Sequence, residues 1–414
     1  MDRVTVWDDR RGPDDRARLA PGRPRDLDRS PDVLVVGGGA IGLAAAVFAR
    51  RAGLGRVTLI ERAPRLVPGA SSGNGGAIAP DLHEESDGPR FVAFGRKSRQ
   101  LYRDLDAEWQ GAIGAWPTRW LDIRPVEAFP LRGGLLDAAG VQAFPGRGGL
   151  LDAAGVQAFP GRGGLLDAAG VRALEPDVRL PDGAAARLFE DQLAVDPLRL
   201  AAALAARAGQ VVTGVGLLGV SVRGDRVSTV HTTAGDLTPG ALVVATGLVP
   251  PPWHQGVRQR WVKGHMLALA PGPWRLGSVL AGPYGGGTPL PGGGVVCGGT
   301  FDEGDRSPEV RPEVSDPMAK DLATLVPAAA EARISHRWCC FRPHIEHRQP
   351  VVDRLPGVTN AWFAGGHFTT GIMMAPATGA ALADWIGSGR TPEDVRTFTL
   401  PRTPSPWPTL GPTH

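Results

Sequence analysis

Three glycines with the spacing G-x-G-x-x-G form the first chemical motif of the sequence: Gly37, Gly39 and Gly42. They follow the apolar run Val33–Val36 and open an alanine-rich stretch over residues 41–52. In dinucleotide-binding units the first glycine permits a tight turn, the second lets the backbone approach a pyrophosphate, and the third lets helix and strand pack closely. Amides at the start of the helix then face the phosphate charge. The motif therefore predicts a strand, a phosphate-binding turn and a helix.

An acidic residue stands where a ribose would be bound. Glu61 ends the expected strand Val57–Glu61, about 20 residues after Gly42, and a carboxylate at this spacing accepts hydrogen bonds from ribose hydroxyls. Strand, turn, helix, strand and acid in this order predict a dinucleotide site. The motif alone leaves NAD and FAD as alternatives, because both cofactors use it.

A second G-x-G-x-x-G pattern, at Gly214, Gly216 and Gly219, lacks this context. Residues 220–223 and 227–232 alternate in polarity as β-strands do, and no helix follows the glycines to bind a phosphate. We therefore expect strand and turn here, and no second dinucleotide site of the kind that flavin reductases use for a pyridine nucleotide.

Length and composition predict a globular protein of about two domains. The chain has 414 residues, of which 42% are hydrophobic and 21% charged. Its apolar runs are shorter than the ~20 residues that span a bilayer, and the N-terminus, charged from Asp2 onward, lacks the apolar stretch of a signal peptide. Three cysteines suit a reducing compartment, so we expect a cytoplasmic protein. Charges of both signs are mixed along the chain, which disfavours nucleic-acid binding.

Strand-like and helix-like stretches alternate between two tails, as in an α/β fold. Residues 1–31, rich in Asp, Arg and Pro, and the proline-rich residues 401–414 are expected to be disordered. Beyond the elements already named, we expect helices over residues 91–108, 197–208 and 377–386, and strands over residues 211–213, 219–223, 226–232 and 242–245.

A tandem repeat with a period of fifteen residues occupies residues 126–172. The sequence GGLLDAAGVQAFPGR at residues 133–147 recurs unchanged at residues 148–162, and residues 163–172 begin a third copy. Loops tolerate insertions well, so we interpret the repeat as an inserted loop. A repeat-built binding surface is the alternative.

Two further segments separate the cofactor alternatives. GASSGNGGAIAP at residues 69–80 and AGGHFTTGIMMAPATGAA at residues 364–381 resemble the glycine/D-amino-acid oxidase-like (DAO) family of FAD-dependent oxidoreductases. The likeness covers residues 33–386, interrupted by the repeat, and its C-terminal part is most similar to glycine oxidase. Shorter matches lie at residues 175–176, 195–197, 245–247, 262–267 and 341–343, with Asp353.

The resemblance implies a Rossmann-like FAD-binding domain built from both chain ends, with an inserted antiparallel β-sheet substrate domain. It assigns residues 32–90, 191–250 and 341–400 to the FAD-binding domain. Residues 91–190, which include the repeat, become a helical and substrate-domain segment, and residues 251–340 the substrate domain.

The resemblance also implies which residues hold FAD. The glycine motif and Glu61 would bind the ADP half, residues of the 69–80 loop would lie beside the flavin ring, and Val212 would approach the adenosine. A helix expected to start near Pro376 would aim its N-terminus at the flavin and stabilise the negative charge of its reduced form. The residues implied are Gly37, Gly39, Gly42, Glu61, Arg62, Ser71, Ser72, Asn74, Gly75, Val212, Gly247, His367, Gly371, Ile372 and Met373.

Arg342 and Tyr284 are the implied substrate-binding residues. A guanidinium can hold an amino acid by its carboxylate with two parallel hydrogen bonds, and Arg342 stands where glycine oxidase-like proteins place an arginine. Tyr284 lies in the segment where family members often place a substrate-contacting tyrosine. Thr369 and Thr370 stand where those proteins usually have Arg-Asn, so one cation of the family pattern is missing.

The implied function is oxidative deamination of a small amino acid of the glycine, D-amino-acid or N-methyl amino-acid class. The substrate would lose a hydride to the flavin, and oxygen or another acceptor would reoxidise the flavin. No catalytic acid–base residue is identified. A flavin-binding relative without amine chemistry and an NAD-dependent dehydrogenase are the alternatives.

Cys339 and Cys340 allow two interpretations. Some sarcosine oxidase-like members attach their flavin through a cysteine near this place, and Cys340 is the closer match. A buried, inert thiol is the common state of cysteine and the alternative we prefer. His344 and His347 lie nearby, but no Cys/His spacing here fits a zinc site, and we expect no metal.

Overall fold

A six-stranded sheet of order β17-β18-β11-β1-β2-β8 has β1, Val33–Val36, near its centre. The computed structural model describes residues 4–24, 26–129, 156–157, 164–249, 259–345 and 350–400. All neighbours in this sheet are parallel except β17 and β18. Its other strands are β2 (Val57–Glu61), β8 (Gln210–Thr213), β11 (Ala241–Val244), β17 (Val351–Arg354) and β18 (Ala361–Gly365).

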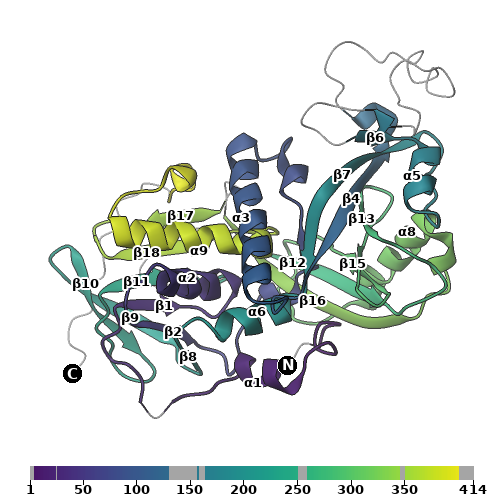
Figure 1. The fold of residues 1–414 in the computed structure, drawn as a ribbon. Coiled ribbons are helices and arrows are strands. Elements are labelled where there is room, and N and C mark those ends of the chain that lie inside the picture. Colours follow the sequence, from purple (N-terminus) through teal and green to yellow (C-terminus); the bar gives the residue numbers. More distant parts are fainter. Residues whose placement is uncertain are drawn as a thin grey trace.

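Both faces of this sheet are covered, which explains the unbroken apolar run of β1. Val33 and Val35 join the core formed with helices, whereas Leu34 and Val36 join a second core with the hairpin β9–β10. Figure 1 shows α2 and α9 side by side along the sheet. The helices of this lobe are α2 (Ala40–Arg51), α3 (Pro89–Glu108), α6 (Pro197–Ala205) and α9 (Gly371–Ser388), and the hairpin strands are β9 (Leu217–Arg223) and β10 (Arg226–Thr232).

Two sheets form the second lobe (Figure 1). One has the order β13-β4-β7-β6-β5 with β3 paired to β7, and the other has the order β14-β15-β12-β16. All pairs are antiparallel except β13–β4, which is parallel. The strands are β3 (Ala77–Ile78), β4 (Ala115–Pro125), β5 (Val156–Gln157), β6 (Gly164–Leu166), β7 (Ala184–Val195), β12 (Gln259–Leu269), β13 (Ser278–Ala281), β14 (Thr288–Pro289), β15 (Val295–Gly298) and β16 (Ile334–Ile345).

The two sheets share one apolar core with short helices. Leu121 and Leu188 from the first sheet meet Leu267 and Val295 from the second, and Leu322 of a helix completes the contact. The remaining helices of the described residues are α1 (Pro13–Leu19), α5 (Ala168–Leu174), α7 (Pro312–Ser315) and α8 (Pro317–Leu325), with single turns at Ser71–Gly73, Pro80–His83, Val126–Ala128, Pro327–Ala329 and Glu393–Val395.

The mixed α/β fold is confirmed, but two expected domain boundaries do not coincide with the sheets. The boundary at residue 340 falls inside β16, which continues to Ile345. The helix after residue 90, α3, packs against α9 in the first lobe rather than in the second. Helices and strands named from the sequence otherwise occur close to their expected places.

The expectation of a disordered segment at residues 1–31 is wrong for the residues described there. Trp7 is fully buried, and its indole Nε1 donates to the carbonyl oxygen of Asn74 at 3.0 Å. The backbone then bonds to the first lobe, where Leu66 N–H donates to Leu19 O at 2.7 Å. An Arg- and Asp-rich segment is ordered here because its charges find partners on both lobes, as Asp9 does on His336 at 3.1 Å.

Other expectations fall partly outside the described residues. The first two full copies of the repeat lie almost entirely there, as do residues 401–414 and His347. The third copy begins with β6 and α5, whose first turn is capped by the Asp167 carboxylate accepting from Gly170 N–H at 2.8 Å. Within the described residues, no helix combines the length and the apolar character needed to cross a membrane.

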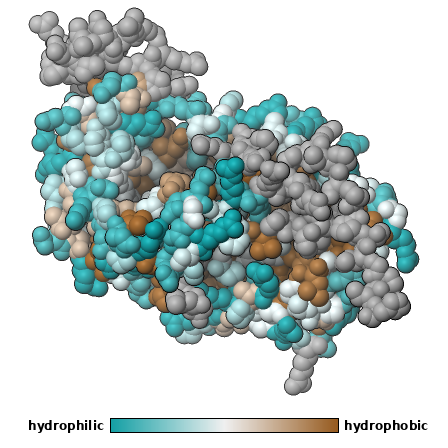
Figure 2. Space-filling model, turned by 180° about the vertical axis from the view of Figure 1, so that it is seen from behind, coloured by the Kyte–Doolittle hydropathy of each residue, from teal (hydrophilic) through white to brown (hydrophobic). Residues whose placement is uncertain are grey.

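One face of the molecule is mostly hydrophilic, as Figure 2 shows from behind, with hydrophobic residues in separate small patches. Large exposed hydrophobic side chains are few among the described residues: Val4, Leu218, Val249, Trp261 and Phe301. Isolated residues of this kind are normal on protein surfaces. Phe301 lines a cavity between the lobes, and Val249 and Trp261 line a groove beside the parallel sheet.

The late helix starts earlier than expected. α9 begins at Gly371, and Pro376 lies in its interior rather than near its start. A proline there has no N–H for the carbonyl four residues earlier, which belongs to Ile372. That oxygen accepts instead from the hydroxyl of Tyr102 on α3, at 2.7 Å. A buried tyrosine far away in the sequence therefore allows the helix to continue through its proline.

We expect Tyr102→Phe to lower the free energy of unfolding by about 1–3 kcal/mol, because it leaves the Ile372 carbonyl buried without a donor. Pro376→Ala supplies the missing N–H, so in that background the same substitution should cost clearly less. Urea unfolding of the four proteins of this double-mutant cycle measures the difference. Equal losses in both backgrounds would contradict the explanation.

Candidate cofactor groove and active-site cavity

A groove of about 340 Å³ opens where β1, β2 and β11 end and α2 and α9 begin. Ligands of open parallel sheets bind in this position, beyond the carboxyl ends of the strands. Ten of the residues implied to bind FAD line the groove: Gly37, Gly39, Glu61, Arg62, Ser71, Asn74, Gly247, His367, Gly371 and Ile372.

The three motif glycines are required for different reasons. Gly37 has φ 115°, and a side-chain carbon there would lie 2.3 Å from Ala245 O. At Gly42 the same atom would lie 1.9 Å from Gly37 O, so helix and turn meet only through glycine. At Gly39 the nearest atom is Ser71 Oγ at 3.6 Å, and the space is open. The protein itself leaves room at Gly39, where a pyrophosphate must approach the backbone.

Two backbone N–H groups fix the Glu61 carboxylate at the edge of the groove. Its Oε2 accepts from Gly38 N–H at 2.7 Å and its Oε1 from Ala63 N–H at 2.8 Å. A carboxylate has about four acceptor positions, so two remain for ribose hydroxyls. Ser71 Oγ accepts from Ala40 N–H at 3.1 Å, which caps the start of α2 beside the groove.

The first turn of α9 borders the groove. Its amides at Gly371, Ile372 and Met373 have no partners within the helix, as in the first turn of any α-helix. Because α9 starts at Gly371, these amides carry the positive end of the helix dipole. The expectation that a helix N-terminus reaches this region therefore holds, with the helix starting five residues earlier than expected.

His367 is neutral at the back of the groove. Its Nε2 lies 3.1 Å from the Thr378 hydroxyl, and burial lowers its pKa to about 3. An imidazole with that pKa carries no charge near neutral pH and offers no proton reservoir for catalysis.

A second cavity of about 670 Å³ lies between the lobes. Its walls come from residues 73–75, from β12 and β16, from the segment after β15, and from residues 368–370 before α9. Asn74 and Phe368 line both this cavity and the groove, so the two adjoin there. Gly75 and Met373, implied to contact flavin, line the cavity rather than the groove. A ligand that filled the groove would thus enter the cavity beside residues 73–75.

Arg342 lies in this cavity as a buried cation without an acidic partner. Its side chain is among the buried charged groups, and it forms no ion pair with any residue that the structure describes. Nη1 donates to Thr300 O at 2.7 Å, and the guanidinium carbon lies 4.6 Å from the centre of the Phe301 ring. Burial lowers its pKa, but a guanidinium remains charged in proteins.

The guanidinium of Arg342 lies directly over two glycines. A side-chain carbon at Gly264 would come within 2.3 Å of Arg342 Nη2, and one at Gly299 within 2.5 Å. Gly264 is on β12, beside Cys340 of β16 in the antiparallel ladder. Because Gly264 and Gly299 carry no side chain, they leave the space that the Arg342 guanidinium occupies.

The opposite wall of the cavity is mixed. Trp120, Leu280 and Met318 contribute apolar surface, and Asp122 and Arg124 form an ion pair with 2.8 Å between Oδ2 and Nη2. Burial is the largest effect on Asp122 and raises its pKa, although Arg124 opposes the shift. This pair satisfies itself. Asp321 also lines the cavity but is exposed, so Arg342 is the buried cation of the cavity that has no ionic partner in the described residues.

Three implied residues are not brought to the site. Tyr284 packs against the core of the second lobe and does not line the cavity. Val212 is fully buried in the sheet core, and Ser72 is buried beneath its loop with its hydroxyl toward Gly69 O at 3.4 Å. Sequence position misleads here because the side chains of Val212 and Ser72 are buried, whereas the neighbouring Ser71 faces the groove.

Several lining residues were not anticipated. Thr300, Phe301 and Phe368 surround Arg342 and the junction of the cavities, and Met266 lies opposite Gly75, 3.2 Å from an added carbon there. Met266 and Phe368 lie in the family-like segments 262–267 and 364–381, but nothing in those segments assigns them to the cavity, and Thr300 and Phe301 lie in no such segment. The adjacent glycines Gly298 and Gly299 are a sequence signal of a close approach.

The two cysteines of interest face different ways. Cys340 lines the cavity, with Sγ 3.7 Å from Gly73 O, and Cys339 lies on the other face of β16, with Sγ 3.3 Å from Pro308 O. Both are free and buried. Among the described residues no group of three or more His, Cys, Asp or Glu side chains could hold a metal ion.

Comparison with known proteins agrees with this geometry. Residues 32–385 match the family model DAO, described as FAD dependent oxidoreductase. Glycine oxidase from Bacillus subtilis is 28% identical over 178 residues, which are 42% of this chain and 48% of that protein. D-amino acid dehydrogenase from Cereibacter sphaeroides is 29% identical over 191 residues, 44% of this chain and 42% of that protein. The chain thus spans less than half the length of these curated relatives.

Solved structures resemble the whole fold. Glycine oxidase from Geobacillus kaustophilus has a TM-score of 0.72 at 25% identity, with 91% of this chain and 99% of that chain covered. L-proline dehydrogenase from P. horikoshii has a TM-score of 0.73 at 19% identity and covers 90% of this chain and 97% of its own. At that identity the second likeness concerns the fold alone.

We expect Glu61→Gln to weaken FAD binding roughly tenfold, because an amide cannot accept from Gly38 N–H and ribose hydroxyls as a carboxylate does. Titration of apoprotein with FAD, followed by quenching of flavin fluorescence, gives the dissociation constants. Glu190→Gln, an exposed residue outside both cavities, is the matched control. Unchanged affinity in Glu61→Gln would remove Glu61 from the cofactor site.

Proposed function

This chain belongs to the DAO family of FAD-dependent oxidoreductases, and on that premise we propose that it oxidises a small amino acid at the carbon that bears the amine. The substrate class comprises glycine, D-amino acids and N-methyl amino acids. The family match decides against the NAD-dependent alternative, because the groove is part of an FAD-dependent family's domain. Oxygen or another acceptor takes up the electrons at the end of the cycle.

The buried, unpartnered guanidinium of Arg342 carries this proposal. An isolated charge in a protein interior is costly, and a substrate carboxylate is the group that would relieve it with two parallel hydrogen bonds. The cation lies in the cavity that adjoins the groove at Asn74 and Phe368. A carboxylate held there places the rest of a small amino acid between Arg342 and the residues that line the groove entrance.

The residues of the groove fit FAD. Glu61 suits the ribose, Gly39 leaves space for the pyrophosphate, and the first turn of α9 offers positive potential at the junction of the cavities. When bound, FAD supplies the hydride acceptor. The substrate carbon loses its hydrogen with an electron pair, the amine becomes an imine, and water then hydrolyses the imine to an oxo acid and an amine or ammonia.

This chain's own residues position the substrate. Arg342 fixes the carboxylate, and the rings of Phe301 and Phe368, 5.9 Å apart, cover it from one side. His367 is neutral and buried, so no residue near the groove acts as a cationic acid. Holding the reacting carbon in one orientation is the main contribution that the cavity makes.

Thr369 and Thr370 line the cavity where glycine oxidase-like proteins usually carry Arg-Asn. A second cation for the substrate is therefore absent from this segment. We therefore favour substrates that need only one contact to their carboxylate. Glycine is one member of the panel to be tested and is not the presumed substrate.

We expect the purified protein to show a flavin spectrum that bleaches anaerobically with one or more of glycine, sarcosine, D-alanine, D-proline and L-proline. Bleaching identifies both the cofactor and the substrate class, because hydride transfer reduces the flavin. A flavin spectrum that none of these amines changes would favour the alternative, a flavin-binding relative without amine chemistry.

Arg342→Ala should raise the KM for the reducing amino acid about 100-fold or more, since removing one partner of a buried charge pair costs several kcal/mol. Arg342→Lys should fall between, because an ammonium keeps the charge but loses the planar fork. Bound FAD should remain stoichiometric in both variants by absorbance. Unchanged KM in Arg342→Ala would refute the assignment of Arg342.

A further inference from the structure

Arg342 depends for its position on one segment of the second lobe, residues 299–311, here called the support loop. The support loop follows β15 and ends before α7. Its first residues make the two contacts that hold the guanidinium: Thr300 O accepts from Nη1 at 2.7 Å, and the Phe301 ring lies 4.6 Å below the guanidinium carbon. No carboxylate among the described residues fixes Arg342 instead, so a displaced support loop would displace the arginine.

The support loop is bound to β12 by backbone hydrogen bonds. Lys263 N–H donates to Asp302 O at 2.8 Å, and Asp302 N–H donates back to Lys263 O at 2.9 Å. Two residues further along β12, His265 N–H donates to the Thr300 hydroxyl at 2.9 Å. This short ladder continues the pairing of β15 along the same edge of β12, opposite the edge that pairs with β16.

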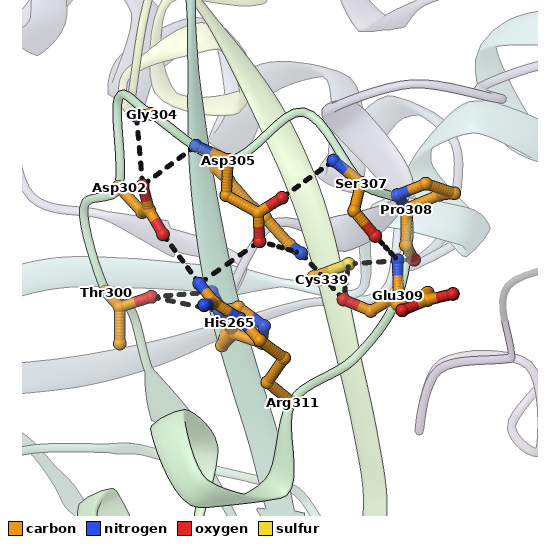
Figure 3. A network of polar contacts seen from close by, with 11 residues as sticks. His265, Thr300, Asp302, Gly304, Asp305, Ser307, Pro308, Glu309, Arg311 and Cys339 are labelled. Atoms are coloured by element: carbon orange, nitrogen blue, oxygen red, sulfur yellow. Dashed lines mark hydrogen bonds and ion pairs between the residues drawn. The ribbon is translucent and has the colours of Figure 1, made fainter.

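A buried lysine fastens the far part of the support loop. The Lys263 side chain is fully buried, and its Nζ donates to Asp305 Oδ2 at 2.7 Å and to Glu309 O at 2.7 Å. Figure 3 shows the surrounding network, in which Asp302, Asp305 and Glu309 of the support loop lie among polar contacts beside His265. One ammonium thus joins two points of the support loop that are four residues apart.

The charges around Lys263 balance. Arg311 pairs with Asp302 at 2.6 Å and with Asp305 at 3.1 Å, so two cations face two carboxylates in the support loop and β12. Hydrogen bonds from Lys263 and then from Ser307 N–H hold the pKa of Asp305 below its ordinary value. Burial, and then the charge of Lys263, lowers the pKa of His265. The neighbouring imidazole is therefore neutral and does not compete with Lys263 for the carboxylates.

Lys263 cannot touch the substrate itself. Side chains alternate along a β-strand, and Gly264, the next residue, lies under Arg342 on the cavity face. Lys263 and His265 consequently face the opposite side of β12, where they meet the support loop. Any effect of Lys263 on the cavity must pass through the backbone of residues 299–311.

We propose that Lys263 is a positioning residue for Arg342: by tying Asp305 and Glu309 to the rear of β12 it fixes the support loop, whose Thr300 carbonyl and Phe301 ring hold the guanidinium ready for a substrate carboxylate. This inference rests on the proposed function of Arg342. A buried lysine is costly to desolvate, and an apolar residue would often serve stability as well. The positioning role explains why a charge stands there.

A double-mutant cycle tests the proposal in the FAD-loaded full chain. Lys263→Met keeps the length of the side chain and removes the charge. It should raise the KM of the amino acid that reduces the wild-type flavin at least tenfold, while the FAD dissociation constant changes less than twofold. In the Arg342→Ala background the same substitution should change KM less than twofold, because the loop then has no guanidinium to position.

Amide hydrogen exchange supplies a readout that needs no substrate. Peptides covering residues 299–309 should exchange at least tenfold faster in Lys263→Met, whereas peptides of β1 and α2 should be unchanged. Arg337→Met is the matched control: Arg337 lies on β16 and pairs with Asp316 at 2.6 Å, outside the support loop. It should leave both KM and loop exchange unaltered. If Lys263→Met does not fold, Asp305→Asn removes the same ion pair with less burial.

The outcomes distinguish a failure of the Lys263 proposal from a failure of the function proposed for Arg342. Unchanged loop exchange in Lys263→Met overturns the proposal, and so does an equal rise of KM in both backgrounds, since Lys263 would then act independently of Arg342. If Arg342→Ala alone leaves KM unchanged, the proposed function of Arg342 fails. Faster exchange in Lys263→Met together with a normal KM also overturns the proposal, because the loop would move without displacing the arginine.

Discussion

The backbone approaches itself closely at the turn between β1 and α2, and the cofactor groove depends on that contact. A side-chain carbon at Gly42 would lie 1.9 Å from Gly37 O, and one at Gly37 would lie 2.3 Å from Ala245 O. These approaches seat α2 against the sheet and bring the end of β11 beside the turn, so that Glu61 and Gly247 reach one groove. α9 then packs on α2, where a carbon added at Gly379 would lie 2.6 Å from Ala44. Its first turn is thereby placed at the junction with the second cavity.

Two buried cations, Lys263 and Arg342, lie on opposite faces of β12 and β16, and we assign a structural role to the first and a functional role to the second. Lys263 is neutralised by Asp305, as a buried charge in a stable protein must be. Among the described residues, Arg342 contacts a carbonyl and an aromatic ring and forms no ion pair. Its charge faces the cavity, so the free energy that would be gained by pairing it would be available to a ligand carboxylate. In our proposal, one buried charge thus serves structure and the other is completed by substrate.

The loop that lines both cavities is held by indoles from two separate segments. Trp338 of β16 donates to Gly73 O at 3.1 Å, and Trp7 donates to Asn74 O at 3.0 Å. The first belongs to the second lobe, and the second precedes the residues matched by the family model. Both hydrogen bonds fix backbone carbonyls next to Gly75, whose lack of a side chain leaves the cavity open toward Met266. Contacts from outside the family region therefore help to shape a site that the family shares.

The sequence by itself determined the strand, turn and helix around Gly37, the role open to Glu61, and the family, because these features depend on neighbouring residues or on motifs read directly from the chain. It also pointed to Arg342, but not to what surrounds it. Only the tertiary structure decided that Arg342 has no ionic partner among the described residues, that Tyr284 and Val212 lie in packed cores, and that residues 4–24 and 26–31 are ordered. It also decided where α9 begins, because Tyr102 replaces the N–H that Pro376 lacks. Each of these facts is a contact between segments far apart in sequence, which local patterns cannot encode.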